Sequence, residues 1–182
     1  MSSKPTPYIK GVFLKSHINA VAKARGSKGL KQLELCYGKQ LTYKNLDDVP
    51  VRDEIKLLEC AIQIISDKLI DPSQLSYEAG RLHFVNFSTT PLAKFVLPFF
   101  RNNFKRLMLG AKHLAGHVFR GVEFSTEELG EKSVALTMAN ADYHIDHFRG
   151  LLQAWMEYCG LQGTIQATEL KNKTYKYNVK WD

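Results

Sequence analysis

Apolar and polar positions alternate along the C-terminal third of the chain in a pattern that predicts two pairs of strands around one helix. Alternation with a period of two runs through residues 121–125 and 133–138, and again through 163–169 and 174–181. Such alternation indicates strands with one buried face. Between the pairs, residues 144–158 place apolar side chains at steps of three and four, as on one face of a helix. The order β-β-α-β-β predicts a small antiparallel sheet with one helix against a face.

The N-terminal two thirds of the chain carry apolar residues at helical spacing, divided by residues that start or stop helices. A capping side chain, a proline in the first turn or a glycine after the last turn marks each boundary. These signals predict helices that begin near residues 16, 27, 50, 71 and 90, with Ser16 as the first cap and a loop over 42–49. Pro98 should kink or break the helix that begins at residue 90, after which the helical run continues to Phe119.

These patterns predict one α+β domain over residues 1–182, in which a helical N-terminal half packs on a C-terminal antiparallel sheet. The expected parts are a flexible lead over 1–7, a mainly helical part over 8–118 and the β-β-α-β-β unit over 119–182. A chain of 182 residues is long enough to bury a sizeable core without disulfides or metals.

The cysteines and the chain start bear on the cellular compartment. Cys36, Cys60 and Cys159 are far apart and show no CxxC spacing, so we expect reduced core thiols and neither a disulfide nor a zinc site. The first seven residues lack the apolar core of a signal peptide, and no apolar run reaches the roughly 18 residues that span a bilayer. We therefore expect a cytoplasmic protein without a membrane span.

Charge is segregated along the chain. Residues 1–46 carry nine Lys or Arg and one acid, and residues 90–122 carry six basic residues and no acid. Residues 123–169, in contrast, carry eight acids and two basic residues. Such blocks predict either solvated faces that keep the protein soluble or a basic face offered to an acidic partner.

The stretch 99–106 interleaves phenylalanines with cations. This pattern can bind single-stranded nucleic acid through stacking and phosphate contacts. On a helix, however, the two kinds of side chain would fall on different faces, which is typical of amphipathic packing, and we do not expect nucleic-acid binding. The candidates for binding an acidic partner protein are Arg101, Lys105, Arg106 and Lys112.

Two pairs of histidines have a spacing that could serve a metal or a cofactor. In the first pair, His144 and His147 lie one helical turn apart beside Asp142 and Asp146. A metal site at this cluster would need a third ligand and a second shell, and acids and caps are expected at a helix start in any case. We therefore expect no metal site here.

In the second pair, His113 and His117 have the i, i+4 spacing on a helix of small and apolar residues, without the glutamate of HExxH. Either imidazole could be the axial ligand of a haem, or it could be an ordinary buried or groove-lining histidine. The chain contains no GxSxG, no glycine-rich phosphate loop and no papain-type cysteine context. We therefore expect that the protein is not an enzyme.

Three short motifs occur in an order that marks a family resemblance. They are Ile9-Lys-Gly11, Leu75-Ser-Tyr-Glu-Ala-Gly-Arg81 and Phe148-Arg-Gly-Leu-Leu152. With the two closing strands, their order resembles bacterial haem nitric-oxide/oxygen-binding domains, vinyl-reductase-type ligand-binding domains and the transport-particle subunits of Golgi traffic. Within this superfamily the chain is most similar to a myxobacterial-type paralogous family of unknown function. The resemblance covers nearly the whole chain and implies helices packed on a sheet, with a ligand pocket or channel between them.

The chain departs from the haem-binding relatives at one motif. Those relatives carry Tyr-x-Ser-x-Arg, which holds the haem propionates, ten residues before the Phe-x-Gly-Leu helix. This chain has Met138-Ala-Asn-Ala-Asp142 there, with an acid in place of the cation. An anion buried beside an unpaired acid is costly. His113 lies near the place of the family's axial ligand, but without the propionate motif we expect no cofactor.

The function we expect is that of a non-catalytic bacterial sensory or adaptor module. It would bind a partner protein with an acidic surface, a small apolar ligand, or both. The alternative is a haem-based gas sensor with His113 or His117 as the axial ligand. The transport-particle relatives dimerise and can bury an acyl chain on a cysteine. Their resemblance implies a possible homodimer and makes Cys60 a candidate for acylation, beside its simpler role as a core thiol.

Overall fold

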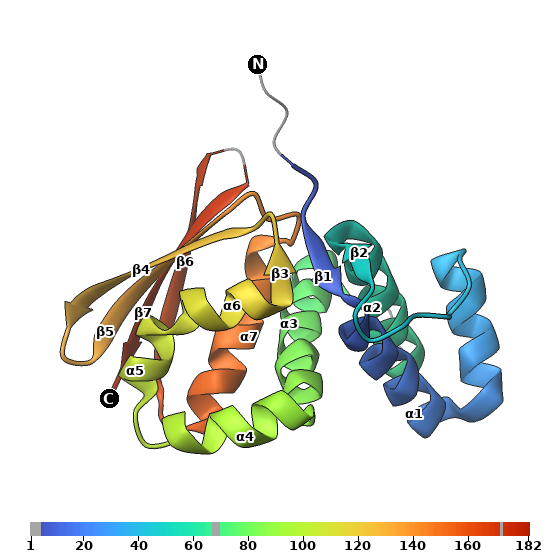
Figure 1. The fold of residues 1–182 in the computed structure, drawn as a ribbon, viewed down its shortest axis with the longest axis horizontal. Coiled ribbons are helices and arrows are strands. Elements are labelled where there is room, and N and C mark those ends of the chain that lie inside the picture. The colour runs from blue at the N-terminus through green and yellow to red at the C-terminus, as the bar shows by residue number, and fades with distance from the viewer. Residues whose placement is uncertain (1–4, 67–69, 172) are drawn as a thin grey trace.

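A computed structural model describes residues 5–66, 70–171 and 173–182, and it confirms the predicted α+β fold (Figure 1). In chain order the elements are β1 (Tyr8–Lys10), α1 (Gly11–Tyr37), β2 (Asp48–Pro50), α2 (Val51–Ser66), α3 (Pro72–Ser88), α4 (Pro91–Phe100), α5 (Phe104–Leu109), α6 (Ala111–Val118), β3 (Phe119–Arg120), β4 (Glu123–Gly130), β5 (Ser133–Ala139), α7 (Ile145–Tyr158), β6 (Gly163–Lys171) and β7 (Thr174–Trp181). Of the predicted flexible lead, residues 1–4 lie outside the described residues.

The C-terminal unit has the predicted β-β-α-β-β order. Its four strands are antiparallel in the order β4-β5-β7-β6, and α7 packs against the strands β6 and β7. Tyr177 of β7 is fully buried, and its hydroxyl donates to the carbonyl of Ile145 at 3.0 Å, which fixes the start of α7 on the sheet. Phe148 lies on the same side of α7 and places its ring centroid 6.4 Å from that of Tyr177.

A second, smaller sheet joins the start of the chain to its middle. Its strand order is β2-β1-β3, and Tyr8 of β1 pairs with Pro50 on one side and Arg120 on the other. The sequence predicts a short extended or helix-entry segment over residues 8–14 and a loop over 42–49, because strands of two or three residues are too short to show alternation. The predicted loop therefore ends in β2, at Asp48.

The first helix begins earlier than predicted. It starts at Gly11, and Ser16 is an internal residue whose hydroxyl donates to the carbonyl of Phe13 at 2.6 Å, so the prediction of Ser16 as a cap is wrong. The predicted break is confirmed, since Gly26 has φ 60° and ψ −154° and separates two helical pieces. Gly38 ends the second piece in the left-handed region, and its N–H donates to the carbonyl of Glu34.

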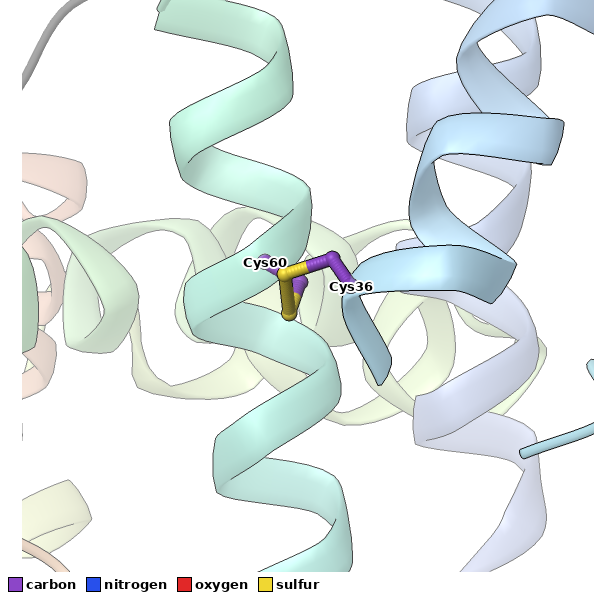
Figure 2. The surroundings of a disulfide bond; sticks show 2 residues. All are labelled: Cys36 and Cys60. Atoms are coloured by element: carbon purple, nitrogen blue, oxygen red, sulfur yellow. A yellow bond between two sulfur atoms is a disulfide. The ribbon is translucent and has the colours of Figure 1, made fainter. Parts of the chain in front are cut away.

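The prediction of three reduced cysteines is wrong, because Cys36 and Cys60 form a disulfide (Figure 2). The second piece of α1 packs against the middle of α2, which brings the two Cα atoms to 6.0 Å. This separation lies in the range that a disulfide requires, although 24 residues separate the cysteines in sequence. Because the sulfur of Cys60 is bonded to Cys36, Cys60 has no thiol for the acylation that the resemblance implies.

Two of the motifs that mark the family resemblance pack against each other where α3 crosses α7. A Cβ on Gly80 of α3 would overlap the carbonyl oxygen of His147, and a Cβ on Gly150 of α7 would overlap the carbonyl oxygen of Tyr77. Glycine at both positions lets the two backbones approach closely, and α3 and α7 form the most extensive contact in the fold. This crossing joins the helical half to the C-terminal unit.

The helical run that the sequence predicts up to Phe119 is divided into three helices. Pro98 lies in the last turn of α4, which ends at Phe100, as the prediction of a break at this proline requires. Asn103 then caps α5, and Gly110 separates α5 from α6, so the prediction of one continuous helix after Pro98 is wrong. None of the described helices combines the length and the apolar character needed to cross a bilayer.

Candidate functional site

An apolar cavity of about 70 Å³ lies between the helical half and the four-stranded sheet. Helices α3, α6 and α7 supply most of its walls, Phe13 of α1 contributes one side, and Phe124 and Leu136 close it toward the sheet. Among its lining residues only His83 and Trp155 carry polar side-chain atoms. An engineered apolar cavity of roughly 150 Å³ stays dry and binds benzene or xenon, so this one has room for a few heavy atoms.

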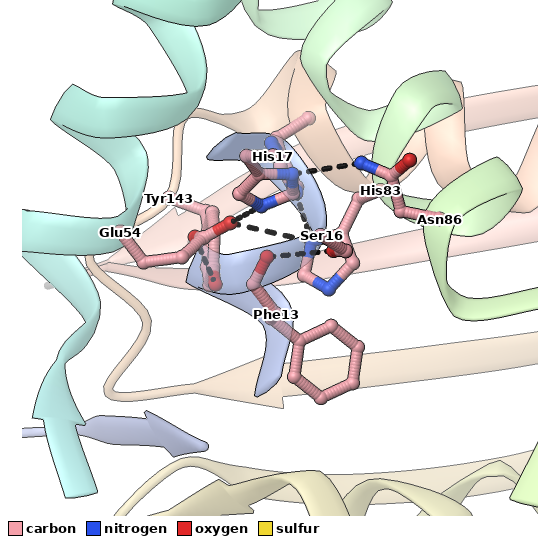
Figure 3. Close-up of polar contacts among 8 residues, drawn as sticks. Phe13, Ser16, His17, Glu54, His83, Asn86 and Tyr143 are labelled. Carbon is pink, nitrogen blue, oxygen red and sulfur yellow. Dashed lines mark hydrogen bonds and ion pairs between the residues drawn. The ribbon is translucent and has the colours of Figure 1, made fainter. Parts of the chain in front are cut away.

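Behind the His83 wall lies a network of buried polar side chains (Figure 3). Its centre is the carboxylate of Glu54 on α2, which is fully buried. His17 of α1 donates from Nε2 to Glu54 Oε1 at 2.7 Å, and the hydroxyl of Tyr143 donates to Glu54 Oε2 at 2.8 Å. Each carboxylate oxygen thus has its own donor, which is what a buried charge requires.

The network continues from His17 and Glu54 into α3 and α7. Asn86 donates from Nδ2 to His17 Nδ1 at 2.8 Å, which leaves the His17 proton on the nitrogen that faces Glu54. His83 places Nδ1 3.3 Å from His147 Nε2 and 3.9 Å from Glu54 Oε1. The network therefore links α1, α2, α3 and α7 through side chains that are all at least nine-tenths buried.

The surroundings set the protonation of these groups. Burial lowers the pKa of His83 to about 4 and that of His147 to about 3, so both imidazoles are neutral at pH 7. Burial acts to raise the pKa of Glu54, but the hydrogen bond from His17 and the nearby imidazoles outweigh it and lower the pKa to about 2. Burial and the adjacent Glu54 carboxylate raise the pKa of Tyr143 well above its usual value, which keeps its hydroxyl a donor. The network holds one buried negative charge among neutral groups and His17.

The buried polar side chains around Glu54 are held together by hydrogen bonds with one another. Across the described residues, no three side chains of His, Cys, Asp or Glu are arranged to hold a metal ion. The predicted pair of His144 and His147 is divided by the fold: His147 enters the buried network, whereas His144 caps α7 and accepts from the N–H of Asp146.

The structure places His113 and His117 on the exposed side of α6. The neighbouring Leu114 and Ala115 line the cavity, but neither histidine does. The imidazole at the cavity is instead that of His83, which no motif in the sequence singles out. One signal for it was present, since His83 falls four residues from Ala79 and from Phe87 on the apolar stripe of α3.

The four basic residues predicted to bind an acidic partner have different surroundings. Arg101 and Arg106 are exposed, and the guanidinium of Arg101 lies 5.9 Å from the ring centroid of Tyr158. Lys105 forms an ion pair with Glu128 at 2.6 Å. Lys112 lines an open groove between α6 and the first two strands of the larger sheet, β4 and β5.

The segment at the place of the family's propionate motif is occupied by contacts within the chain. Asp142 forms an ion pair with Lys173 and lies 3.8 Å from the guanidinium of Arg52. Asn140 has a positive φ of 57° and donates to the carbonyl of Gly121 at 2.6 Å. These contacts hold the end of β5 against neighbouring segments.

Comparison with solved structures finds the same fold in H-NOX domains. The Fe(II) unliganded H-NOX protein from K. algicida is 14% identical with a TM-score of 0.69, and the match covers 96% of this chain and 97% of that one. A mutant of the T. tengcongensis H-NOX is 14% identical with a TM-score of 0.64, covering 96% of this chain and 98% of that one. A comparison with curated proteins finds no match. A family model described as "Protein of unknown function (DUF2378)" matches residues 4–182, and the chain belongs to this family.

Proposed function

We propose that the protein is a non-catalytic sensory module that holds a small apolar ligand in the cavity between its helices and its sheet. The observation that carries this proposal is the apolar cavity of about 70 Å³, walled by α3, α6, α7 and the sheet. Apolar cavities with a few polar groups are the usual form of small-molecule sites. The H-NOX fold supports a ligand site at the junction of helices and sheet, and the size of the cavity limits the ligand to a few heavy atoms.

Xenon tests this proposal, because it binds dry apolar cavities without chemical requirements. We expect xenon pressure to shift the methyl resonances of Leu114, Leu136 and Leu152 in a saturable way. Ala115→Phe should fill the cavity and abolish these shifts, whereas Ala24→Phe on an exposed side of α1 should leave them unchanged. Shifts that do not saturate, or that survive the filling variant, would refute the proposed site.

A haem-based gas sensor is the second candidate, and the likeness to H-NOX structures favours it over a partner-binding role. The residues around the cavity do not fit haem in this conformation, however. The cavity is far below the roughly 300 to 1,000 Å³ of ordinary ligand sites, and His113 and His117 lie outside it. Reconstitution with haem followed by an absorbance spectrum tests this candidate. A Soret band that His113→Ala or His117→Ala removes would establish it.

We also propose an adaptor role, which concerns the exposed cations that follow α4. No acid occurs between residues 90 and 122, and Arg101, Arg106 and Lys112 are exposed cations of this stretch that would attract an acidic partner. A labelled polyglutamate peptide is a suitable probe, and its binding should weaken as salt screens the charges. Charge reversal at these three residues should abolish binding, whereas reversal at Lys23 and Lys31 of α1 should not. Equal binding by both sets of variants would show that these cations are not the binding site for an acidic partner. Homodimer formation stays a prediction.

A further inference from the structure

Helix α4 presents two phenylalanine rings to solvent at one edge of the fold. Phe95 and Phe99 are each 72% exposed, and their ring centroids lie 5.7 Å apart. Pro98 is exposed on the same helix, whereas Ala93 and Leu97 are buried and hold its other side against the core. In Figure 1 α4 runs along the lower edge of the molecule, below α3 and α7. Exposed apolar side chains that occur singly are ordinary, but a pair in contact on one helix face points to an interaction surface.

Cations flank these rings, and the same segment contains no acid. Lys94 lies one residue before the first ring and Arg101 two residues after the second, and both side chains are exposed. Residues 90–122 contain six basic residues and no acid. Arg101 reaches the end of α7, where Glu157 is already paired with Arg81 at 2.8 Å. The surface that carries the rings therefore complements an anionic partner.

The shape and the charge of this surface favour a lipid bilayer over a protein. The rings line neither the apolar cavity nor the open groove, so a protein partner would have to supply both a pocket for the rings and acids for the cations. A second copy that docked through α4 would bring the cations of both copies together, because a two-fold interface pairs one surface with itself. Like charges placed close together across an interface oppose association. An anionic bilayer accepts the rings at the boundary of headgroups and acyl chains and attracts the cations by its surface potential.

We propose that α4 is a peripheral membrane-binding surface for anionic lipid. Phe95 and Phe99 enter the boundary between headgroups and acyl chains, and Lys94 and Arg101 contact the lipid phosphates. With 10 residues α4 is too short to span a bilayer, so the contact is with the membrane surface. This inference goes beyond the proposed ligand site and does not depend on it, because the rings lie outside the cavity.

Sedimentation with lipid vesicles tests the proposal. We expect the protein to bind phosphatidylcholine vesicles in which about one lipid in three is phosphatidylglycerol, and to bind pure phosphatidylcholine at least about 10-fold more weakly. Phe95→Ser with Phe99→Ser should weaken binding to the anionic vesicles at least about 10-fold, because the two rings no longer enter the lipid. Lys94→Gln with Arg101→Gln should weaken this binding about 5-fold for each cation, and added salt should weaken the binding of the wild-type protein.

Variants elsewhere on the surface are matched controls. Leu35 and Leu46 are 84% and 82% exposed, so Leu35→Ser with Leu46→Ser removes a second pair of exposed apolar side chains without changing α4. Lys23→Gln with Lys31→Gln neutralises two exposed cations of α1. Both control pairs should bind the anionic vesicles as the wild-type protein does. All of these side chains are exposed, so the variants should fold.

A tryptophan at the proposed contact measures insertion directly. Phe95→Trp should show a blue-shifted emission on anionic vesicles, whereas Trp155 and Trp181 are buried and already shielded from water. Absence of binding to anionic vesicles, or binding that Phe95→Ser with Phe99→Ser does not weaken, would overturn the proposal. Sedimentation equilibrium without lipid supplies the remaining test. A wild-type dimer that the same two substitutions convert to a monomer would also overturn it, since a second copy would then cover the rings.

Discussion

The buried histidines make the stability of this protein depend on pH in a way that can be calculated. His83 and His147 have ordinary pKa values near 6.5 in the unfolded chain and lowered values of about 4 and 3 in the folded protein. Between pH 6.5 and 4 the unfolded chain therefore binds up to two more protons than the folded one. Since a group that is protonated only on unfolding favours the unfolded state, stability is full above pH 6.5 and falls as the pH is lowered.

The slope follows from the number of protons. Each histidine contributes up to about 1.4 kcal/mol per pH unit, so the free energy of unfolding should fall by about 2.5 kcal/mol per unit near pH 5. Glu54 acts in the same direction at lower pH, because its folded pKa of about 2 lies below its unfolded value. From pH 7 to 4.5 the loss is about 5 kcal/mol, which is comparable with the whole stability of many domains.

Urea unfolding followed by tryptophan fluorescence at several pH values between 7 and 4.5 measures this slope. His147→Phe removes one of the two groups that bind a proton on unfolding. The slope of the free energy of unfolding near pH 5 should therefore fall to about 1.2 kcal/mol per pH unit. His113→Gln, on the exposed side of α6, is the matched control and should leave it unchanged. A wild-type slope near zero, or one that His147→Phe does not alter, would show that these imidazoles are not held neutral.

Three further predictions concern packing, the disulfide and the buried carboxylate. Gly150→Ala should lower the free energy of unfolding by about 1 to 3 kcal/mol or more, because the added Cβ would overlap a backbone carbonyl of α3 that cannot move freely. Reduction of the Cys36–Cys60 disulfide, or its replacement by two serines, should cost about 2 to 4 kcal/mol, since it closes a loop of 24 residues. Tyr143→Phe leaves one oxygen of Glu54 without its donor and should cost about 1 to 3 kcal/mol. Chemical unfolding at pH 7 measures all three.

Each of these predictions has a control within the chain. Gly116→Ala adds a Cβ in open space on α6 and should not destabilise the protein. Cys159→Ser changes the cysteine outside the disulfide and should leave the effect of reducing agent intact. Tyr8→Phe removes a hydroxyl from the middle strand of the smaller sheet and leaves both donors of Glu54 in place. A glycine variant as stable as wild type would contradict the close α3–α7 crossing, and equal stability of oxidised and reduced protein would contradict the disulfide.

The sequence predicts those elements whose signals are local. Alternation marks the strands of the C-terminal unit, and Asp71 and Thr90 cap α3 and α4 as expected from their side chains and the prolines that follow. The breaks before α5 and between α5 and α6 are missed because Asn103 and Gly110 lie in a stretch whose apolar residues continue the helical spacing. A local signal for a break was present there, but the apolar pattern outweighs it.

Features that depend on distant contacts are predicted less well. Cys36 and Cys60 meet because α1 packs against α2, and the spacing of the cysteines alone does not show this packing. Glu54 lies in the first turn of α2, where an acid is expected for the helix dipole, so nothing local indicates that it is buried. The spacing of His113 and His117 places them on one face of a helix of eight residues, too short for its apolar pattern to show which face turns inward.

The partners of Glu54 also bear on how the chain can be divided. His17 lies 37 residues before it and Tyr143 lies 89 residues after it, so the carboxylate gains its last donor only when the C-terminal unit arrives. A fragment that ends after α6 would bury this charge with one oxygen unpaired, or would leave α2 partly exposed. During synthesis, nearly half of the chain must be made after α2 before both donors to Glu54 are present. We expect the helical segment alone to aggregate or to be degraded. Gene fusions should therefore contain this chain whole.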